Sequence, residues 1–199
     1  MAQQIIIATG NEGKMREFRE ILSDLPLMLT SLRDHWDPVP EIEENGSSFL
    51  ENATIKADWV FDRTGIWALA DDSGLEVDAL EGGPGVKSAR YAGEGAGAQA
   101  NNEKLLKVLE GVPVAERSAR FRCVLVLKTG KGIYHSYEGT CEGTIDIAAH
   151  GTYGFGYDPL FIPAGYDRSF AELGQKEKHA ISHRGNALRR LREYLYESV

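Results

Sequence analysis

The spacing of apolar and polar residues predicts that the chain begins with a strand, a helix and a second strand. Residues Gln3–Ala8 contain three consecutive isoleucines, a run that is typical of a strand buried on both faces. Apolar residues at helical spacing then predict a helix over about Lys14–Ser23. Leu27–Ser31 has the pattern of a short strand, and the acidic, proline-containing segment Asp34–Asn45 is predicted to be a loop.

A second helix and two more strands are predicted further along. Ser47 or Ser48 can cap the helix, because Glu51 lies three residues after Ser48 and completes a capping box. The apolar run Ile66–Ala70 predicts a strand that ends on the polar sequence after it. Leu75–Ala79 then predicts another short strand, separated from the first by a turn.

The second half of the chain continues the mixture of helices and strands. It predicts a helix over Asn101–Glu110, a hairpin of Ala119–Lys128 and Gly132–Asp146, a strand over Leu160–Ile162 and a basic amphipathic helix within Ile181–Tyr196. Strands interleaved with helices, together with one long hairpin, predict an α/β fold with a mixed central sheet and flanking helices. No repeat or linker divides the sequence, so we expect one domain over residues 1–199, with room for two closely packed lobes.

Composition and charge narrow the classes of protein that are possible. The 199 residues are 42% hydrophobic and 26% charged, which excludes an intrinsically disordered chain. No apolar run has the roughly 18–20 residues of a membrane span. A net charge of −8 argues against duplex DNA or RNA as a partner, whereas a few local cations could still hold a small anion. Two cysteines and the absence of a secretory signal predict a cytoplasmic protein.

A glycine-containing loop follows the first predicted strand and is a candidate phosphate site. It consists of Thr9, Gly10, Asn11, Glu12, Gly13 and Lys14. Backbone N–H groups at a helix N-terminus favour phosphate, and the lysine adds a positive charge. The spacing is not that of a Walker A loop. A polar turn with a solvated lysine is the alternative.

A pair of carboxylates follows the strand at Ile66–Ala70 and is a candidate metal or catalytic site. Asp71 and Asp72, followed by Ser73, could hold Mg²⁺ through oxygen, and one of them could take a proton from an attacking water. The alternative is an Asp-Gly turn between two short strands. Glu44 belongs to a nearby acidic run, a pattern that is usually a solvated surface.

Two segments near the C-terminus offer groups for ligand recognition. The loop Gly151–Pro159 mixes glycine with aromatic residues, so Phe155 and Tyr157 could either stack on a base or pack into the core. Ser182 can cap the last helix, which places His183 and Arg184 in its first turn. Cations there oppose the helix dipole, which indicates either a binding site or a solvated first turn.

Taken together and in order, these motifs resemble one family. The matching segments are Ala8–Lys14, Glu51–Ala57, Ala70–Leu75, Pro84–Val86, Ser88–Tyr91, Ala119–Leu125, Gly154–Pro159, Ala171–Leu173 and Ser182–Arg184. They resemble the inosine triphosphate pyrophosphatase family, the nonstandard purine NTP pyrophosphatases, and especially its bacterial branch. The resemblance extends over almost the whole chain.

The resemblance implies a fold, a reaction and a set of site residues. It implies two lobes around an active-site cleft, a homodimer, and Mg²⁺-dependent hydrolysis of ITP, dITP or XTP to the monophosphate and pyrophosphate. The family's proton acceptor corresponds to Asp72, and its metal ligands to Asp72 and either Glu43 or Glu44, of which we select Glu44. The implied substrate-binding residues are Thr9, Gly10, Asn11, Glu12, Gly13, Lys14, Lys56, Ser73, Phe155, Gly156, Tyr157, Asp158, Lys178, His183 and Arg184.

Overall fold

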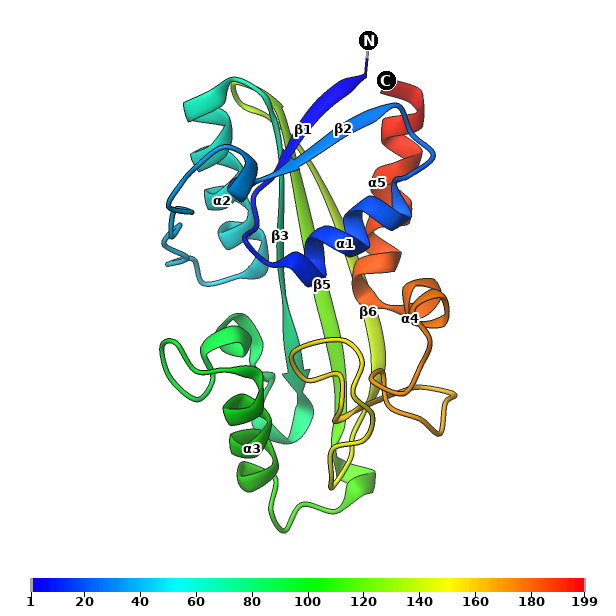
Figure 1. Ribbon diagram of the computed structural model, residues 1–199. Coiled ribbons are helices and arrows are strands. Elements are labelled where there is room, and N and C mark those ends of the chain that lie inside the picture. The colour runs from blue at the N-terminus through cyan, green and yellow to red at the C-terminus, as the bar shows by residue number, and fades with distance from the viewer. Residues whose placement is uncertain (1, 199) are drawn as a thin grey trace. The chain divides into compact units, whose positions relative to one another are not determined.

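The computed structural model describes residues 2–198 and contains a mixed sheet with helices packed against it (Figure 1). The strands are β1 (Gln3–Ile7), β2 (Leu27–Ser31), β3 (Trp67–Val77), β4 (Gly83–Pro84), β5 (Ser118–Gly130), β6 (Ile133–Ile145) and β7 (Phe161–Pro163). The α-helices are α1 (Glu12–Ile21), α2 (Phe49–Thr64), α3 (Ala98–Val108), α4 (Gln175–Ile181) and α5 (His183–Ser198). Short 3-10 turns cover Leu32–Asp34, Asp78–Leu80, Gly85–Arg90 and Val114–Glu116.

The sheet has the strand order β2-β1-β3-β5-β6-β7, with β4 paired to β3. Strand β1 is parallel to β2 and β3, whereas β4 is antiparallel to β3 and β7 is antiparallel to β6. The predicted mixed α/β sheet is therefore confirmed. A short turn at Lys131 and Gly132 joins β5 to β6, and Gly132 has a φ of +71°, a value that glycine adopts at little cost.

The chain forms two compact units, which we call unit 1 and unit 2. Unit 1 contains residues 1–72, 123–139 and 184–199, and unit 2 contains residues 73–122 and 140–183. Unit 1 therefore holds β1, β2, α1, α2 and nearly all of α5, and unit 2 holds β4, β7, α3 and α4. Strands β3, β5 and β6 contribute residues to both.

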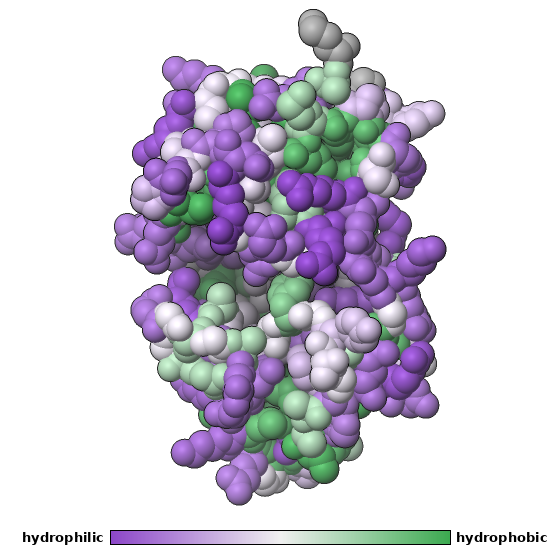
Figure 2. All heavy atoms as spheres, in the orientation of Figure 1, coloured by the Kyte–Doolittle hydropathy of each residue, from purple (hydrophilic) through white to green (hydrophobic). Residues whose placement is uncertain are grey.

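Each unit has its own apolar core. In unit 1, Ile5 and Ile7 of β1 pack with Phe18 of α1 and Leu188 of α5, and α2 covers the opposite face of the sheet (Figure 1). In unit 2, Leu105 of α3 packs in a cluster with buried aromatic rings contributed by Phe121, Phe161, Phe170 and Tyr157. The face drawn in Figure 2 is mostly hydrophilic, and its apolar residues form small separate patches. Among residues 2–198, no helix has the length and apolar character that a membrane crossing requires.

The largest departure from the prediction lies in β3. We expected a strand to end at Ala70 and another to begin at Leu75, yet one strand runs without interruption over Trp67–Val77. The sequence Asp-Asp-Ser-Gly is typical of turns, but here its backbone is paired within a sheet. The carboxylates of Asp71 and Asp72 therefore project from a rigid strand rather than from a loop.

Helices α1 and α3 also differ from their predicted limits, and α4 is an additional helix. Helix α1 begins at Glu12, two residues before the prediction, because the side chain of Asn11 caps it by accepting a hydrogen bond from the N–H of Lys14 (3.0 Å). Helix α3 begins at Ala98 instead of Asn101 and ends at Val108. The short helix α4 was not predicted; Ser182, which has an extended backbone, separates it from α5.

Candidate active site

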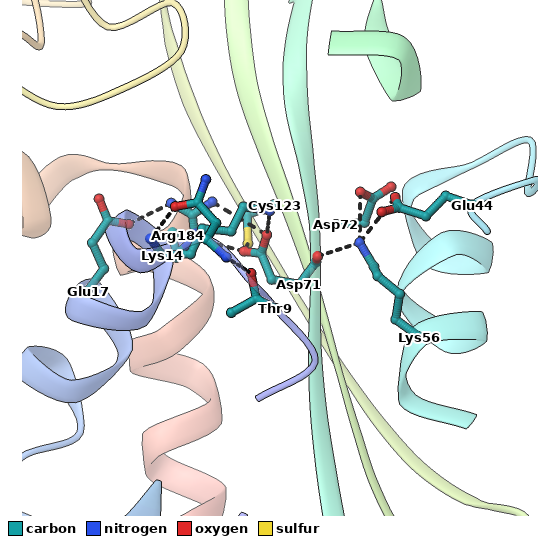
Figure 3. A network of polar contacts seen from close by, with 10 residues as sticks. Thr9, Lys14, Glu17, Glu44, Lys56, Asp71, Asp72, Cys123 and Arg184 are labelled. Atoms are coloured by element: carbon teal, nitrogen blue, oxygen red, sulfur yellow. Dashed lines mark hydrogen bonds and ion pairs between the residues drawn. The ribbon is translucent and has the colours of Figure 1, made fainter. Parts of the chain in front are cut away.

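The alternation of side chains along β3 sends the two aspartates to opposite faces of the sheet (Figure 3). Asp71 points towards α1 and the start of α5, and Asp72 points towards α2. The expectation that adjacent carboxylates together hold one metal ion is therefore wrong. Each aspartate has its own set of partners, and we describe the two sets in turn.

Asp71 lies in a buried network of charges. Arg184 donates from Nε to Asp71 Oδ2 (2.7 Å) and from Nη1 to Glu17 Oε2 of α1 (2.5 Å). Lys14 forms an ion pair with Asp71, and the thiol of Cys123 on β5 donates to Asp71 Oδ2 (3.1 Å). Burial favours the neutral form of Asp71, but Arg184 and Lys14 outweigh it and hold the pKa of this carboxyl well below its usual value.

This network changes the role expected of Arg184. The family resemblance implied that its guanidinium contacts substrate, but the residue is only 1% exposed and is bound by two carboxylates. Its observed contacts link α1, β3 and α5. Glu17 was not among the candidates, although a signal was available. Its spacing of four residues from Ile21 places it at the edge of the apolar face of α1, where a charged residue that becomes buried needs a partner.

Asp72 lies beside Lys56 of α2 on the other face of the sheet. The amine of Lys56 is 3.2 Å from Asp72 Oδ1 and 3.2 Å from Glu44 Oε2, and it donates to the backbone carbonyl of Asp71 (2.7 Å). The structure thus places Glu44 next to Asp72, whereas Glu43 is exposed to solvent. Helix α2 positions Lys56, and the hydroxyl of Ser48 caps this helix as predicted.

Asp72 has two properties that suit a catalytic carboxylate. Its Oδ2 atom is buried and receives no hydrogen bond from any described residue. Burial, reinforced by the neighbouring charge of Glu44 and opposed by Lys56, raises the pKa of Asp72 to about 6. One oxygen is therefore held by Lys56 while the other remains available to a proton or a cation.

The residues around Asp72 are compatible with a magnesium ion, although they do not form a complete cage. Within residues 2–198, no cluster of three or more His, Cys, Asp or Glu side chains could bind a metal ion by itself. Mg²⁺ commonly uses only one or two protein carboxylates and completes its shell with water and substrate phosphates. Asp72, through its available Oδ2, and Glu44 offer such a pair of ligands.

The phosphate-loop candidates lie at the N-terminus of α1. The hydroxyl of Thr9 accepts from the N–H of Asn11 (3.1 Å), and Asn11 in turn caps the helix. Gly10 precedes the cap, while Glu12 and Gly13 occupy the first turn, where N–H groups have no partner within the helix. Lys14 lies in the same turn, and its amine forms an ion pair with the carboxylate of Asp71.

The aromatic-loop candidates lie in unit 2. Lys178 of α4 donates to Asp158 Oδ2 (2.7 Å), which also accepts from the N–H of Phe155 (2.8 Å). The Lys178 amine lies 4.9 Å from the centre of the Phe155 ring. Tyr157, in contrast, is 4% exposed and donates from its hydroxyl to the carbonyl of Ser88 (2.8 Å). Its ring belongs to the core and is not placed to stack on a base.

The remaining two candidates in unit 2 are His183 and Ser73. The imidazole of His183 stacks on the ring of Phe121, with 4.7 Å between the centroids and 12° between the planes. Ser73 follows Asp72 in β3 and is half-buried. The candidates thus fall into two groups: Lys14, Lys56 and Asp72 belong to unit 1, whereas His183 and the aromatic loop belong to unit 2.

A comparison with known protein families shows to which family the chain belongs. The sequence profile of the Ham1 family matches residues 5–194. The chain belongs to the Ham1 family. The match contains every candidate residue described above, and it confirms the family resemblance drawn from the motifs.

Individual Ham1 relatives are similar over almost their full length. A dITP/XTP pyrophosphatase of Geobacter sulfurreducens is 50% identical over 192 residues, which cover 96% of each chain. A dITP/XTP pyrophosphatase of Oceanobacillus iheyensis is 46% identical over 194 residues, with 98% of each chain covered. The solved structure of a HAM1 protein from Coxiella burnetii has a TM-score of 0.89 at 43% identity and covers 98% of this chain and 99% of its own. The Ham1 protein of Staphylococcus aureus has a TM-score of 0.86 at 38% identity and covers 99% of this chain and 100% of its own.

Proposed function

We propose that this Ham1 protein is a pyrophosphatase that hydrolyses ITP, dITP and XTP to the nucleoside monophosphate and pyrophosphate, and so removes these nucleotides from the cellular pool. Relatives named dITP/XTP pyrophosphatase are 46–50% identical over nearly the whole chain. The observation that carries the chemistry is the buried Asp72 carboxylate, held on one oxygen by Lys56 and available on the other.

The triphosphate binds to groups of unit 1. A nucleoside triphosphate carries about four negative charges, so cations must gather locally in a protein whose net charge is −8. Lys14 and the N–H groups in the first turn of α1 supply one such region, and Lys56 supplies a second cation beside Asp72. Thr9–Gly13 positions these groups through the cap of α1.

Asp72 is the proton acceptor of the reaction. A water molecule attacks the α-phosphorus, its proton passes to the Asp72 carboxylate, and the bond to the bridging oxygen of pyrophosphate breaks. A proton acceptor works best when its pKa lies close to the working pH. Burial of Asp72 raises its pKa to about 6, which supports this role. Lys56 keeps the carboxylate in place through Oδ1.

Asp72 and Glu44 are the residues that would hold Mg²⁺. When bound, the ion neutralises phosphate charge and orients the attacking water. Asp71 takes no part in this set, because its side chain lies on the other face of β3. Its role is to hold Lys14 and Arg184.

Residues of unit 2 select the base. Hypoxanthine and xanthine carry a 6-oxo acceptor where adenine carries an amino donor, so a donor in the pocket favours the 6-oxopurines. Lys178 and His183 provide donors, and Phe155 provides an aromatic face. A polar group left unpaired in a dry pocket costs about 1–3 kcal/mol, so two such contacts give roughly 10²–10⁴-fold selection.

The state of the protein in the cell forms a further part of the proposal. We expect a homodimer, on the strength of the family resemblance, and no nucleic-acid partner, because the net charge is −8. Both cysteines are present as free thiols, which is compatible with the reducing cytoplasm.

A turnover panel tests the proposed function. Purified protein is incubated with Mg²⁺ and each of ITP, dITP, XTP, ATP, dATP and GTP, and released phosphate and pyrophosphate are measured separately. We expect pyrophosphate from the first three substrates and little from ATP and dATP, whose bases carry an amino donor at position 6; GTP, which shares the 6-oxo group, shows whether that group alone decides selection. Binding without release of pyrophosphate would indicate a nucleotide sensor, and preference for a modified pyrimidine would indicate a hydrolase of another specificity. Either result contradicts the proposal.

A further inference from the structure

A side chain of α3 holds the backbone of the loop that contains Phe155 and Asp158. Asn102 donates from Nδ2 to the backbone carbonyl of Gly156 (3.1 Å). Both residues belong to unit 2, and Asn102 is half-buried. Gly156 has a φ of +63°, a conformation that glycine adopts readily but can also leave readily. The contact with Asn102 therefore restrains the most permissive backbone position in this part of the loop.

The other end of the Asn102 amide offers no second reason for an asparagine at this position of α3. Its Oδ1 atom is buried and accepts no hydrogen bond from any described residue. Rotating the amide would place this oxygen against the carbonyl oxygen of Gly156, so the donor must face the loop. Leucine has nearly the same shape as asparagine, favours helices more strongly and would bury no unpaired side-chain oxygen. The feature that distinguishes asparagine at this position is the hydrogen bond to Gly156.

The residues on either side of Gly156 are held by other contacts. Phe155 donates its N–H to Asp158, and Asp158 accepts from Lys178. Tyr157 is fixed in the core through its hydroxyl. Asn102 holds the backbone carbonyl of Gly156, which lies between Phe155 and Tyr157 in the chain. It thereby sets the orientation of the peptide that joins Gly156 to Tyr157.

We propose that Asn102 is a positioning residue for base recognition. It contacts no part of the substrate itself. Instead it keeps the loop Phe155–Asp158 in the arrangement that receives the base, so that less conformational freedom is lost when the nucleotide binds. This inference rests on the proposed function, in which the loop lies against a 6-oxopurine.

The test compares Asn102→Leu with a matched variant of the same helix. Gln99 also carries an amide, but it is exposed and donates to Glu103 on the helix surface, so Gln99→Leu serves as the control. Two inhibitors separate the parts of the substrate: inosine monophosphate contains the base, whereas tripolyphosphate contains none. In Asn102→Leu we expect the inhibition constant of inosine monophosphate and the KM for dITP to rise about three- to tenfold. The inhibition constant of tripolyphosphate and the kcat should stay within about twofold of the wild-type values, as should all four constants in Gln99→Leu.

A second variant distinguishes the hydrogen bond from polarity alone. Asn102→Asp keeps the shape of the side chain but turns an acceptor towards the Gly156 carbonyl. It should therefore weaken the binding of inosine monophosphate at least as much as Asn102→Leu does. Unchanged constants for inosine monophosphate in both variants would overturn the inference, as would an equal loss of affinity for tripolyphosphate. Failure of the proposed function is a separate result, since the wild-type protein would then release no pyrophosphate from dITP.

Discussion

The two oxygens of Asp72 lead to a prediction about catalysis. Asn is the same size as Asp and can keep the contact of Oδ1 with Lys56, but it cannot accept a proton from water. We expect Asp72→Asn to lower kcat for dITP by about 10²–10⁴-fold, the usual contribution of a positioned base. Pyrophosphate release measures the rate, and circular dichroism checks that the variant is folded. Turnover within a few fold of the wild type would contradict the role given to Asp72.

The same substitution should reveal the energetic cost of the buried carboxylate. The pKa of Asp72 is raised from 3.8 to about 6 in the folded state, so between these values the folded protein binds more protons than the unfolded one. The free energy of unfolding contributed by this group therefore falls as the pH rises through that window. The free energy of unfolding of Asp72→Asn, measured relative to that of the wild type, should therefore increase by roughly 2 kcal/mol as the pH rises from 4 to 7.5. Urea titrations in the presence of a chelator measure this gain, and a stability difference that does not change with pH would refute it.

At the scale of whole elements, β3 shows where prediction from sequence succeeded and where it could not. Apolar runs predicted β1 and β2 almost to the residue, and alternation predicted the β5–β6 hairpin, because local patterns are sufficient for these elements. The continuity of β3 depends on partners elsewhere. Asp71 is kept in an extended, buried strand by cations at positions 14 and 184, and no local pattern records these contacts.

The same limit applies to the candidate site. Order along the chain indicated the phosphate loop and the paired aspartates, but it could not show that neighbouring aspartates serve different networks. The contact between Glu17 and Arg184 joins residues 167 positions apart, so only the folded structure reveals it. Helix α4 escaped prediction because it is seven residues long and largely polar.

The ion pairs that join α1, β3 and α5 predict that replacing two different arginines of α5 will lower the free energy of unfolding by unequal amounts. Arg184→Met leaves Glu17 and Asp71 buried without their shared partner, so we expect a loss of about 3–5 kcal/mol in the free energy of unfolding. Arg192 of the same helix pairs with Asp24 at the surface, and Arg192→Met should cost less than about 1 kcal/mol. Chemical denaturation measures both values.

A combined variant checks the cause of that loss. Adding Glu17→Gln to Arg184→Met removes one of the uncompensated charges and should restore part of the stability. If Arg184 served only to contact substrate, its replacement would leave stability unchanged and would alter kinetics alone. Equal effects of Arg184→Met and Arg192→Met would therefore exclude the buried network as the main role of Arg184.

For the molecule as a whole, the candidate residues divide by function in the same way as they divide between the units. The groups proposed for the phosphates, Lys14 and Lys56, belong to unit 1, and those proposed for the base, His183 and the aromatic loop, belong to unit 2. Discrimination between 6-oxopurines and adenine should thus respond to different substitutions from those that alter affinity for the phosphates.

Two variants test this division. Lys14→Ala removes a cation from the first turn of α1, so the inhibition constant of tripolyphosphate should rise about tenfold while the ratio of kcat/KM for dITP over dATP stays nearly constant. His183→Ala removes the ring that stacks on Phe121, so this ratio should fall about tenfold, equivalent to 1.4 kcal/mol, with tripolyphosphate bound as before. If either variant changed both quantities to the same extent, selection of the base and binding of the phosphates would not be separable in this protein.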